Sequence, residues 1–166
     1  MSSTNPSDFG AGAVIMWAGS NSNIPAGWHE CDGTLLSTTD YSTLYGVIGL
    51  SFGKSPPSGQ FYLPDLRGQF VRGVDDGAGT DPDSATRTDM QDPSIAWNGV
   101  GSVQSSALQT HTHSYDTVDT NASDGNIQDK SGYNVEGYNS GAPEGANVSQ
   151  SETRPTNAYL YYIIKL

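Results

Sequence analysis

The chain has 166 residues, 34% of them hydrophobic, and it contains 18 acidic but only 7 basic residues. The net charge of −11 argues against nucleic acid as a partner, because phosphate binding requires clustered Lys and Arg. With 20 Gly and 9 Pro, the composition is that of a loop-rich β protein rather than a helical bundle. The length fits one domain, or one domain with an elaborate insertion.

Residues 1–12 are rich in small polar side chains, which predicts a flexible N-terminal arm. This stretch lacks the basic start and the apolar segment of a signal peptide, and no apolar run elsewhere reaches the length of a membrane span. We therefore expect a protein that is made in the cytoplasm without a secretory signal. The single cysteine, Cys31, excludes an intrachain disulfide.

Two strand signals follow the arm. Residues 13–18, AVIMWA, form a continuous apolar run, which predicts a strand buried on both faces. A second stretch begins at Trp28 and ends at Asp32 and Gly33, a pair that is a strong hairpin signal. We expect the side chains of Trp17 and Trp28 to be buried.

His29, Glu30 and Cys31 are consecutive, and these residue types occur in metal and nucleophile clusters. Adjacent strand residues point to opposite faces, so His29 and Cys31 could converge but Glu30 could not join them. A free cysteine more often serves as a small buried hydrophobe. That is the interpretation we favour for Cys31.

The strongest helix signal spans residues 37–49, with the helix itself expected at about 40–49. Residues 37–40, STTD, resemble a capping box, and Gly49 supplies the stop. The predicted apolar face of the helix consists of Leu44, Val47 and Ile48.

Residues 61–73, FYLPDLRGQFVRG, join an apolar run, a proline turn and both signs of charge. Phe61 and Leu63 alternate with a tyrosine, as in a strand, and Pro64 holds Leu63 extended. The pattern predicts a core strand, a tight turn and a second strand that begins at Phe70. Leu63 and Phe70 should be buried, and the charged residues should be solvated or paired at the surface.

Residues 75–83, DDGAGTDPD, could ligate Ca²⁺ through carboxylate oxygens, but they lack the spacing and the closing Glu of an EF-hand loop. A solvated loop is the more frequent use of such a stretch. Residues 84–106 are polar, and we expect Ile95 and Trp97 to anchor them.

His111 and His113 are one residue apart, so in a strand both imidazoles address one point. Two His are too few ligands for a metal site within one chain. Residues 114–151 then lose hydrophobic periodicity, which alone would predict a disordered linker. Residues 159–164, YLYYII, are strongly β-forming and need burial, and a long loop between ordered elements is more often functional than idle.

Four motifs, taken in order, resemble those of the phage tail collar domain family, which is found at the tips of bacteriophage short and long tail fibres. Together they cover about residues 12–74 and 152–166. The motifs are GAVIMW and PAGWHECDG within residues 12–33, YSTLY with Ile48 and Gly49, FYLPDLRGQF at residues 61–70, and ETRPTN at residues 152–157 followed by Ile163 and Ile164.

The resemblance implies a strand-rich α+β fold: a small collar domain with one short helix, intertwined as a homotrimer, plus a long loop-rich polar insertion. The corresponding segments are an N-terminal arm, a collar domain, and a region with the His pair, the polar tip and the C-terminal strand, at residues 1–12, 13–106 and 107–166. In such fibre tips, His-x-His pairs from three chains bind a transition metal on the threefold axis. His111 and His113 would then supply six nitrogens, a set suited to iron or zinc.

The function implied is that of a non-enzymatic, trimeric fibre-tip protein of a phage or prophage virion tail. It would bind a bacterial surface polysaccharide or an outer-membrane receptor through residues 114–151, where Tyr offers rigid stacking area and Asn offers adaptable hydrogen bonds. The candidate receptor contacts are Asn126, Tyr133, Asn134 and Tyr138. The N-terminal arm is expected to join other tail or baseplate proteins.

Two alternatives stay open. One is a structural tail or baseplate adaptor, or a repeating assembly subunit, without receptor contact. The other is an enzyme such as a polysaccharide depolymerase, for which acidic pairs such as Asp75 and Asp83 are easy to find. No base, nucleophile and orienting group are arranged together in the sequence, so we predict no catalytic residues.

Overall fold

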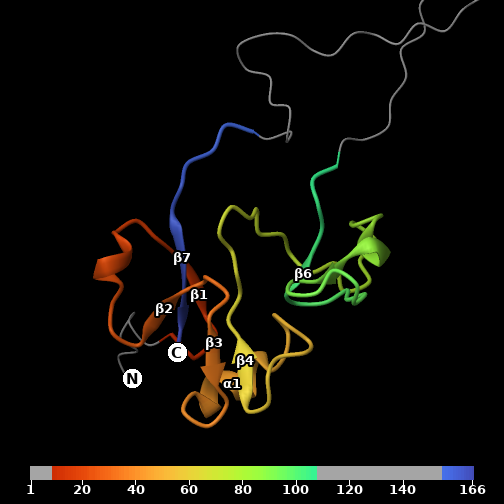
Figure 1. Cartoon of the computed structure of the whole chain (residues 1–166). Helices are drawn as coiled ribbons and strands as arrows, with labels where there is room; N and C mark the ends of the chain where they lie inside the picture. The colour runs from red at the N-terminus through yellow and green to blue at the C-terminus, as the bar shows by residue number, and fades with distance from the viewer. Residues whose placement is uncertain (1–8, 108–154) are drawn as a thin grey trace, which may run out of the picture. The chain divides into compact units, whose positions relative to one another are not determined.

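The computed structural model describes residues 9–107 and 155–166 (Figure 1). Contacts within the chain divide it into one unit of Met1–Ser105 with Thr156–Leu166 and a second unit of Ser106–Pro155. The second unit and most of the predicted N-terminal arm lie largely outside the described residues. In the described ranges, no helix is long and apolar enough to cross a membrane.

The main sheet of the first unit has three antiparallel strands in the order β1-β7-β2, with bounds Val14–Trp17, Tyr161–Lys165 and Trp28–Glu30 (Figure 1). The C-terminal strand β7 thus lies between two strands from the beginning of the chain. Ile163 and Ile164 on β7 are both fully buried, as expected for this β-forming run. The sheet therefore joins the two ends of the sequence.

Burial of β1 on both faces was expected from its apolar run, and that prediction is wrong. Val14 and Met16 are exposed, while Ile15 and Trp17 are half-buried. The physical reason is the position of β1 at the edge of the sheet, where it pairs only with β7. Trp28 on β2 is also only half-buried, with its ring against Phe9 at a centroid separation of 5.6 Å.

A second, two-stranded sheet pairs β3, Leu35–Ser37, with β4, Gln60–Tyr62. The hairpin predicted at Asp32 and Gly33 is therefore wrong, because β2 pairs with β7 and β3 pairs with β4. The turn instead takes the chain from one sheet to the other. Gly33 adopts a φ of 79°, a conformation that favours glycine, so the local turn signal was sound although the pairing was not.

The helix α1 spans Ser42–Ile48 and ends at Gly49, close to the predicted bounds. Ser37 accepts hydrogen bonds from the backbone N–H groups of Thr39 and Asp40, so it stabilises the turn before the helix rather than the helix itself. Leu44 is fully buried as expected, whereas Val47 is exposed. Leu44 therefore anchors α1 to the core, and the half-buried Tyr45 and Ile48 pack against the same cluster.

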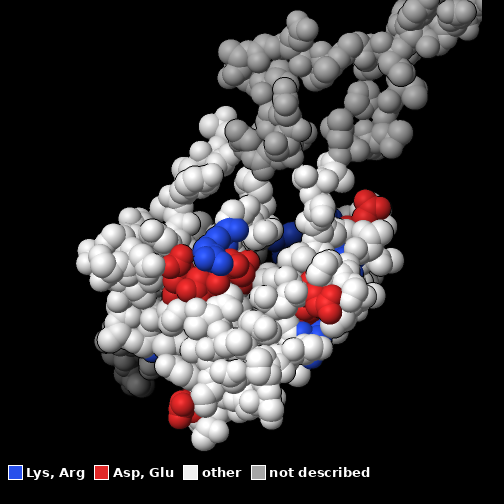
Figure 2. All heavy atoms as spheres, viewed as in Figure 1, with Lys and Arg blue, Asp and Glu red and all other residues white. Residues whose placement is uncertain are grey.

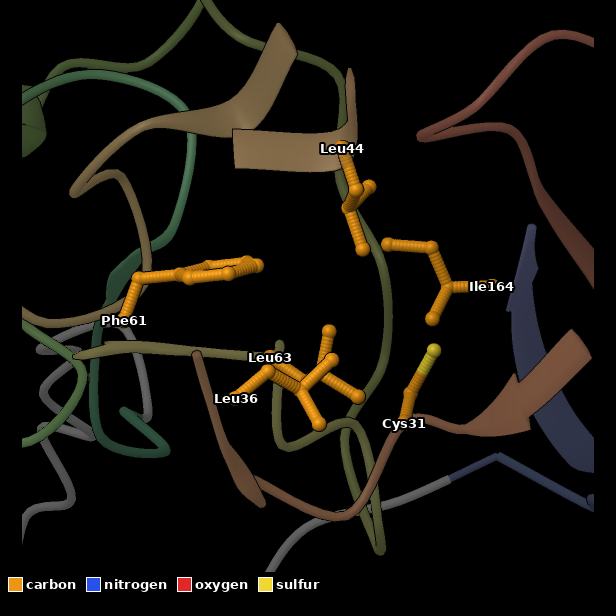
Figure 3. Close-up of a cluster of buried hydrophobic side chains, with 6 residues drawn as sticks. All are labelled: Cys31, Leu36, Leu44, Phe61, Leu63 and Ile164. Atoms are coloured by element: carbon orange, nitrogen blue, oxygen red, sulfur yellow. The ribbon is translucent and has the colours of Figure 1, made fainter. Parts of the chain in front are cut away.

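The core of the unit lies between the two sheets and α1 (Figure 3). Leu63 is buried as predicted, because β4 leads directly into the core. Phe70 is 67% exposed, and no strand forms at residues 70–73, so the predicted second strand after Pro64 is wrong. The buried side chains drawn in Figure 3 are Cys31, Leu36, Leu44, Phe61, Leu63 and Ile164.

The remaining described residues of the unit form short elements joined by turns. A two-stranded sheet pairs β5, Thr88–Asp89, with β6, Ser102–Val103. Two 3-10 turns, η1 and η2, span Asn21–Asn23 and Ser84–Thr86. In its described part, the chain is thus strand-rich with a single short α-helix, in agreement with the predicted α+β class.

Candidate functional site

The turn that follows β4 links the two sheets through backbone hydrogen bonds. Gly33 N–H donates to the Pro64 carbonyl at 3.1 Å, and Leu66 N–H donates to the Cys31 carbonyl at 2.9 Å. A side chain at position 33 would crowd the Asp65 Cβ atom, at 3.2 Å from the added carbon. Glycine at this position is therefore required both for its backbone conformation and for space.

Asp65 and Arg67 form a bidentate pair in the same turn. The Arg67 Nε and Nη2 groups donate to the two Asp65 carboxylate oxygens at 2.8 and 2.6 Å. The hydrogen bonds from Arg67 hold the pKa of Asp65 below its ordinary value. Figure 2 shows acidic side chains gathered on the visible face with a basic group over them. The guanidinium of Arg67 is exposed, so this pair is a surface ion pair within the turn.

Cys31 is not an available nucleophile. Its side chain is almost completely buried in the core, and burial together with the neighbouring carboxylates raises the pKa of the thiol to about 12. The thiolate that would attack a substrate is therefore not formed near neutral pH. The expectation that Cys31 serves as a buried hydrophobe is confirmed.

The acidic loop after residue 74 is organised by its own first carboxylate. Asp75 accepts backbone N–H bonds from Gly79, Thr80 and Asp81 at 3.0, 2.6 and 2.8 Å. These bonds lower the pKa of Asp75. Across the described residues, no group of three or more His, Cys, Asp or Glu side chains is placed to hold a metal ion. Asp75 therefore uses its oxygens to close the loop.

Two buried carboxylates organise the rest of this region. Asp89 accepts backbone N–H bonds from Lys54, Gln91 and Asp92 at 3.0–3.1 Å. The carboxylate of Asp81 pairs with Arg72 and with Arg87, at 3.5 and 3.4 Å.

Arg87 also donates to Ser102 and Gln104, which joins η2 to β6. Through these hydrogen bonds and ion pairs, the buried carboxylates of Asp89 and Asp81 connect the neighbouring loops of this region. Trp97 packs under the Lys54 ammonium group, 3.1 Å from the ring centroid, which agrees with its predicted anchoring role.

Two grooves open on the surface of the first unit. One, of about 390 Å³, is lined by residues 69–75 on one side and residues 98–105 on the other. The other, of about 500 Å³, is lined by Trp17, Leu66, Arg67 and residues 159–162. Both grooves combine aromatic and aliphatic side chains with a few charged ones, a lining that suits a surface that binds another molecule.

The residues that the sequence marked as a metal or receptor site lie outside the described residues. The structure therefore leaves their roles as predictions. They are His111, His113, Asn126, Tyr133, Asn134 and Tyr138. The sequence patterns did not predict the two grooves, because each groove is lined by residues from segments that are far apart in the sequence.

Similarity to known proteins extends along most of the chain. Protein RhiB of Rhizobium leguminosarum bv. viciae is 38% identical over 156 residues, which covers 89% of this chain and 70% of RhiB. The Phage Tail Collar Domain family matches residues 12–71. The chain belongs to the phage tail collar domain family.

Two further proteins are similar to this collar domain protein over most of its length. Putative uncharacterized protein StfE of Escherichia coli (strain K12) is 26% identical, covering 93% of this chain and 86% of StfE. Short tail fiber protein gp12 of Enterobacteria phage T4 is 29% identical, covering 93% of this chain but 34% of gp12. The collar domain protein thus spans about a third of the length of the phage fibre protein.

The part of the chain that matches the family model contains most of the buried core and the turn around Asp65. The matched region runs from the start of β1 to just beyond Phe70, and it holds most of the buried core. Residues 12–71 thus supply most of the hydrophobic core of this collar domain protein.

Proposed function

We propose that this protein is a bacteriophage or prophage-derived tail fibre tip protein, a non-enzymatic homotrimer that binds a receptor on the bacterial surface. The observation on which this rests is the similarity to the T4 short tail fibre protein over 93% of the chain, together with the collar domain. A virion tail location and contacts to other tail or baseplate proteins follow from the same relationship.

The polar tract at residues 114–151 is the proposed receptor surface. Its Tyr and Asn side chains offer the stacking area and hydrogen bonds that suit a polysaccharide or a polar outer-membrane protein. Asn126, Tyr133, Asn134 and Tyr138 are the residues proposed to make contact. The tract returns to the described unit through residues 155–160 and strand β7.

A transition metal is part of the proposal. His111 and His113 of three chains offer six imidazole nitrogens, which suit iron or zinc. A metal bound only by the assembled trimer would stabilise it by mass action.

Deletion of residues 120–148 tests the receptor surface. We expect the deleted protein to stay trimeric, because β1, β7 and the core are untouched, and to lose binding to isolated host envelopes. Size-exclusion chromatography with light scattering reports the first property and a pull-down with envelopes reports the second. Retained binding would assign recognition to another surface, and loss of the trimer would make the tract part of the assembly.

A structural adaptor is the second candidate, and the two apolar grooves favour it, since they fit a protein neighbour. An adaptor would bind no host envelope even as an intact wild-type trimer.

Incubation with host capsule, followed by a search for released reducing ends, tests the non-enzymatic character. Release of reducing ends would contradict it.

A further inference from the structure

A short run of apolar side chains after the Asp65 turn is left uncovered. Phe70, Val71 and Val74 are all more than half exposed, an unusual state for three large hydrophobics within five residues. We call residues 70–74 the apolar ribbon. The ribbon lines the groove of about 390 Å³, whose other lining residues include Val14 and Phe52.

The backbone of the apolar ribbon lies outside the regular elements of the described chain. No helix, strand or turn is assigned at residues 70–74, and within the described residues none of them makes a backbone–backbone hydrogen bond. The last such bond before the ribbon joins Gln69 N–H to Leu66, and the next one joins Ala78 N–H to Asp75. Backbone groups that are unpaired beside exposed apolar side chains are available for pairing with another chain.

A second uncovered stretch lies just before and at the start of β7. Tyr159 is 93% exposed, and Leu160 and Tyr161 are exposed as well. These residues line the groove of about 500 Å³ together with Trp17 and Arg67. We call residues 159–161 the C-terminal approach.

Charge decides which partner these surfaces fit. The chain has 18 acidic residues, yet neither the apolar ribbon nor the C-terminal approach contains one. Figure 2 shows that most of the visible surface is uncharged, with the acidic groups confined to a few places. A chain with a net charge of −11 can associate with copies of itself only where acidic groups do not face one another. Both stretches meet that condition, and the one charged residue of the ribbon, Arg72, is paired with Asp81 of its own chain.

We infer that the apolar ribbon of one copy packs against the C-terminal approach of a neighbouring copy, so that these two stretches form the contact between chains. This inference rests on the proposed homotrimer and names the surface that builds it. Each copy offers two different uncovered stretches, which suits a head-to-tail contact that closes into a ring. A twofold dimer would instead require one stretch to meet itself.

The first test replaces one exposed valine with an acid in the full-length protein. Val71 is 60% exposed in the ribbon and Val47 is 63% exposed on α1, so the two positions are a matched pair. We expect Val71→Glu to lower the assembly mass in solution threefold, whereas Val47→Glu keeps the wild-type mass. An unchanged mass for Val71→Glu, or an equal loss for Val47→Glu, would overturn the inference.

Cross-linking gives an answer even where Val71→Glu fails to fold. Chains with Val71→Cys and chains with Leu160→Cys are co-expressed and treated with a short bismaleimide, to which the buried Cys31 is inaccessible. We expect covalent dimers from the mixture and none from either chain alone. A mixture of Val47→Cys and Leu160→Cys chains is the control, and cross-linking there at the same yield would contradict the inference.

The outcomes separate this inference from the proposed function. If Val71→Glu dissociates the protein but the wild type binds no host envelope, the interface stands and the receptor role fails. If the wild type binds envelopes and Val71→Glu is still assembled, the receptor role stands and the interface fails. A monomeric wild type would remove both the interface and the proposed homotrimer.

Discussion

Two regions of the described unit are held together in different ways. The region from β2 to the Asp65 turn, with β7, is built on a hydrophobic cluster of which Leu44, Phe61 and Ile164 are fully buried. The region from Asp75 to residue 104 has no comparable cluster, and its loops are fixed by carboxylates that accept backbone N–H bonds. In this loop-rich chain, an aspartate that accepts several backbone N–H bonds thus takes the place of a core side chain.

Replacement of Phe61 by alanine should give the largest effect in this comparison. Phe61 is fully buried against Tyr45, with ring centroids 5.3 Å apart, and its loss should reduce the free energy of unfolding by about 3–5 kcal/mol. Urea denaturation measures this change. Phe70→Ala is the matched control, because Phe70 is exposed within the chain. We expect its effect to appear only as a weaker concentration dependence of stability, through the contact between copies.

Removal of the Asp89 carboxylate tests the polar region. Asp89→Ala leaves three backbone N–H groups without their acceptor, and we expect a loss of about 2–3 kcal/mol in the free energy of unfolding. Asp83→Ala removes an exposed carboxylate and should change stability by less than about 0.5 kcal/mol. If both variants are equally stable, the buried carboxylate does not organise this region.

The Asp65–Arg67 pair should give the smallest effect and a characteristic pH dependence. Because the folded state lowers the pKa of Asp65, its contribution is present above the ordinary value of 3.8 and is lost as the pH falls through the lowered pKa. Arg67→Gln removes the cause of the shift. The stability difference between wild type and Arg67→Gln should therefore be measurable near neutral pH and shrink as the pH falls below the ordinary value of 3.8 and through the lowered pKa of Asp65. A difference that is constant with pH would show that Arg67 acts by packing alone.

The parts of the fold that sequence patterns predicted are those with local causes. Gly49 ends α1 because a positive φ is required there, and Leu63 is buried because the alternating strand and Pro64 direct it into the core. The pairing of β2 with β7 was beyond prediction, since the partners are more than 130 residues apart and the Asp32 turn looks locally like a hairpin. Long-range pairing has no local signature.

The exposed apolar residues show a second limit of sequence patterns. Phe70 fits the pattern of a buried strand, yet no other described segment of the same chain covers it. A sequence pattern indicates that such a residue needs burial but does not specify whether the cover comes from its own chain or from a copy. The Arg87 network was missed for a different reason, because its polar partners are spread over residues 81–104 without periodicity.

Native mass spectrometry of the full-length protein, with and without a chelator, tests most directly whether three copies assemble around a metal. We expect the wild type to have the mass of three chains with bound iron or zinc. Chelation, or the double substitution His111→Ala and His113→Ala, should remove the metal and lower the melting temperature of the trimer. A mass of one chain with no metal, and identical melting of wild type, chelated protein and double variant, would contradict the proposed trimeric fibre tip.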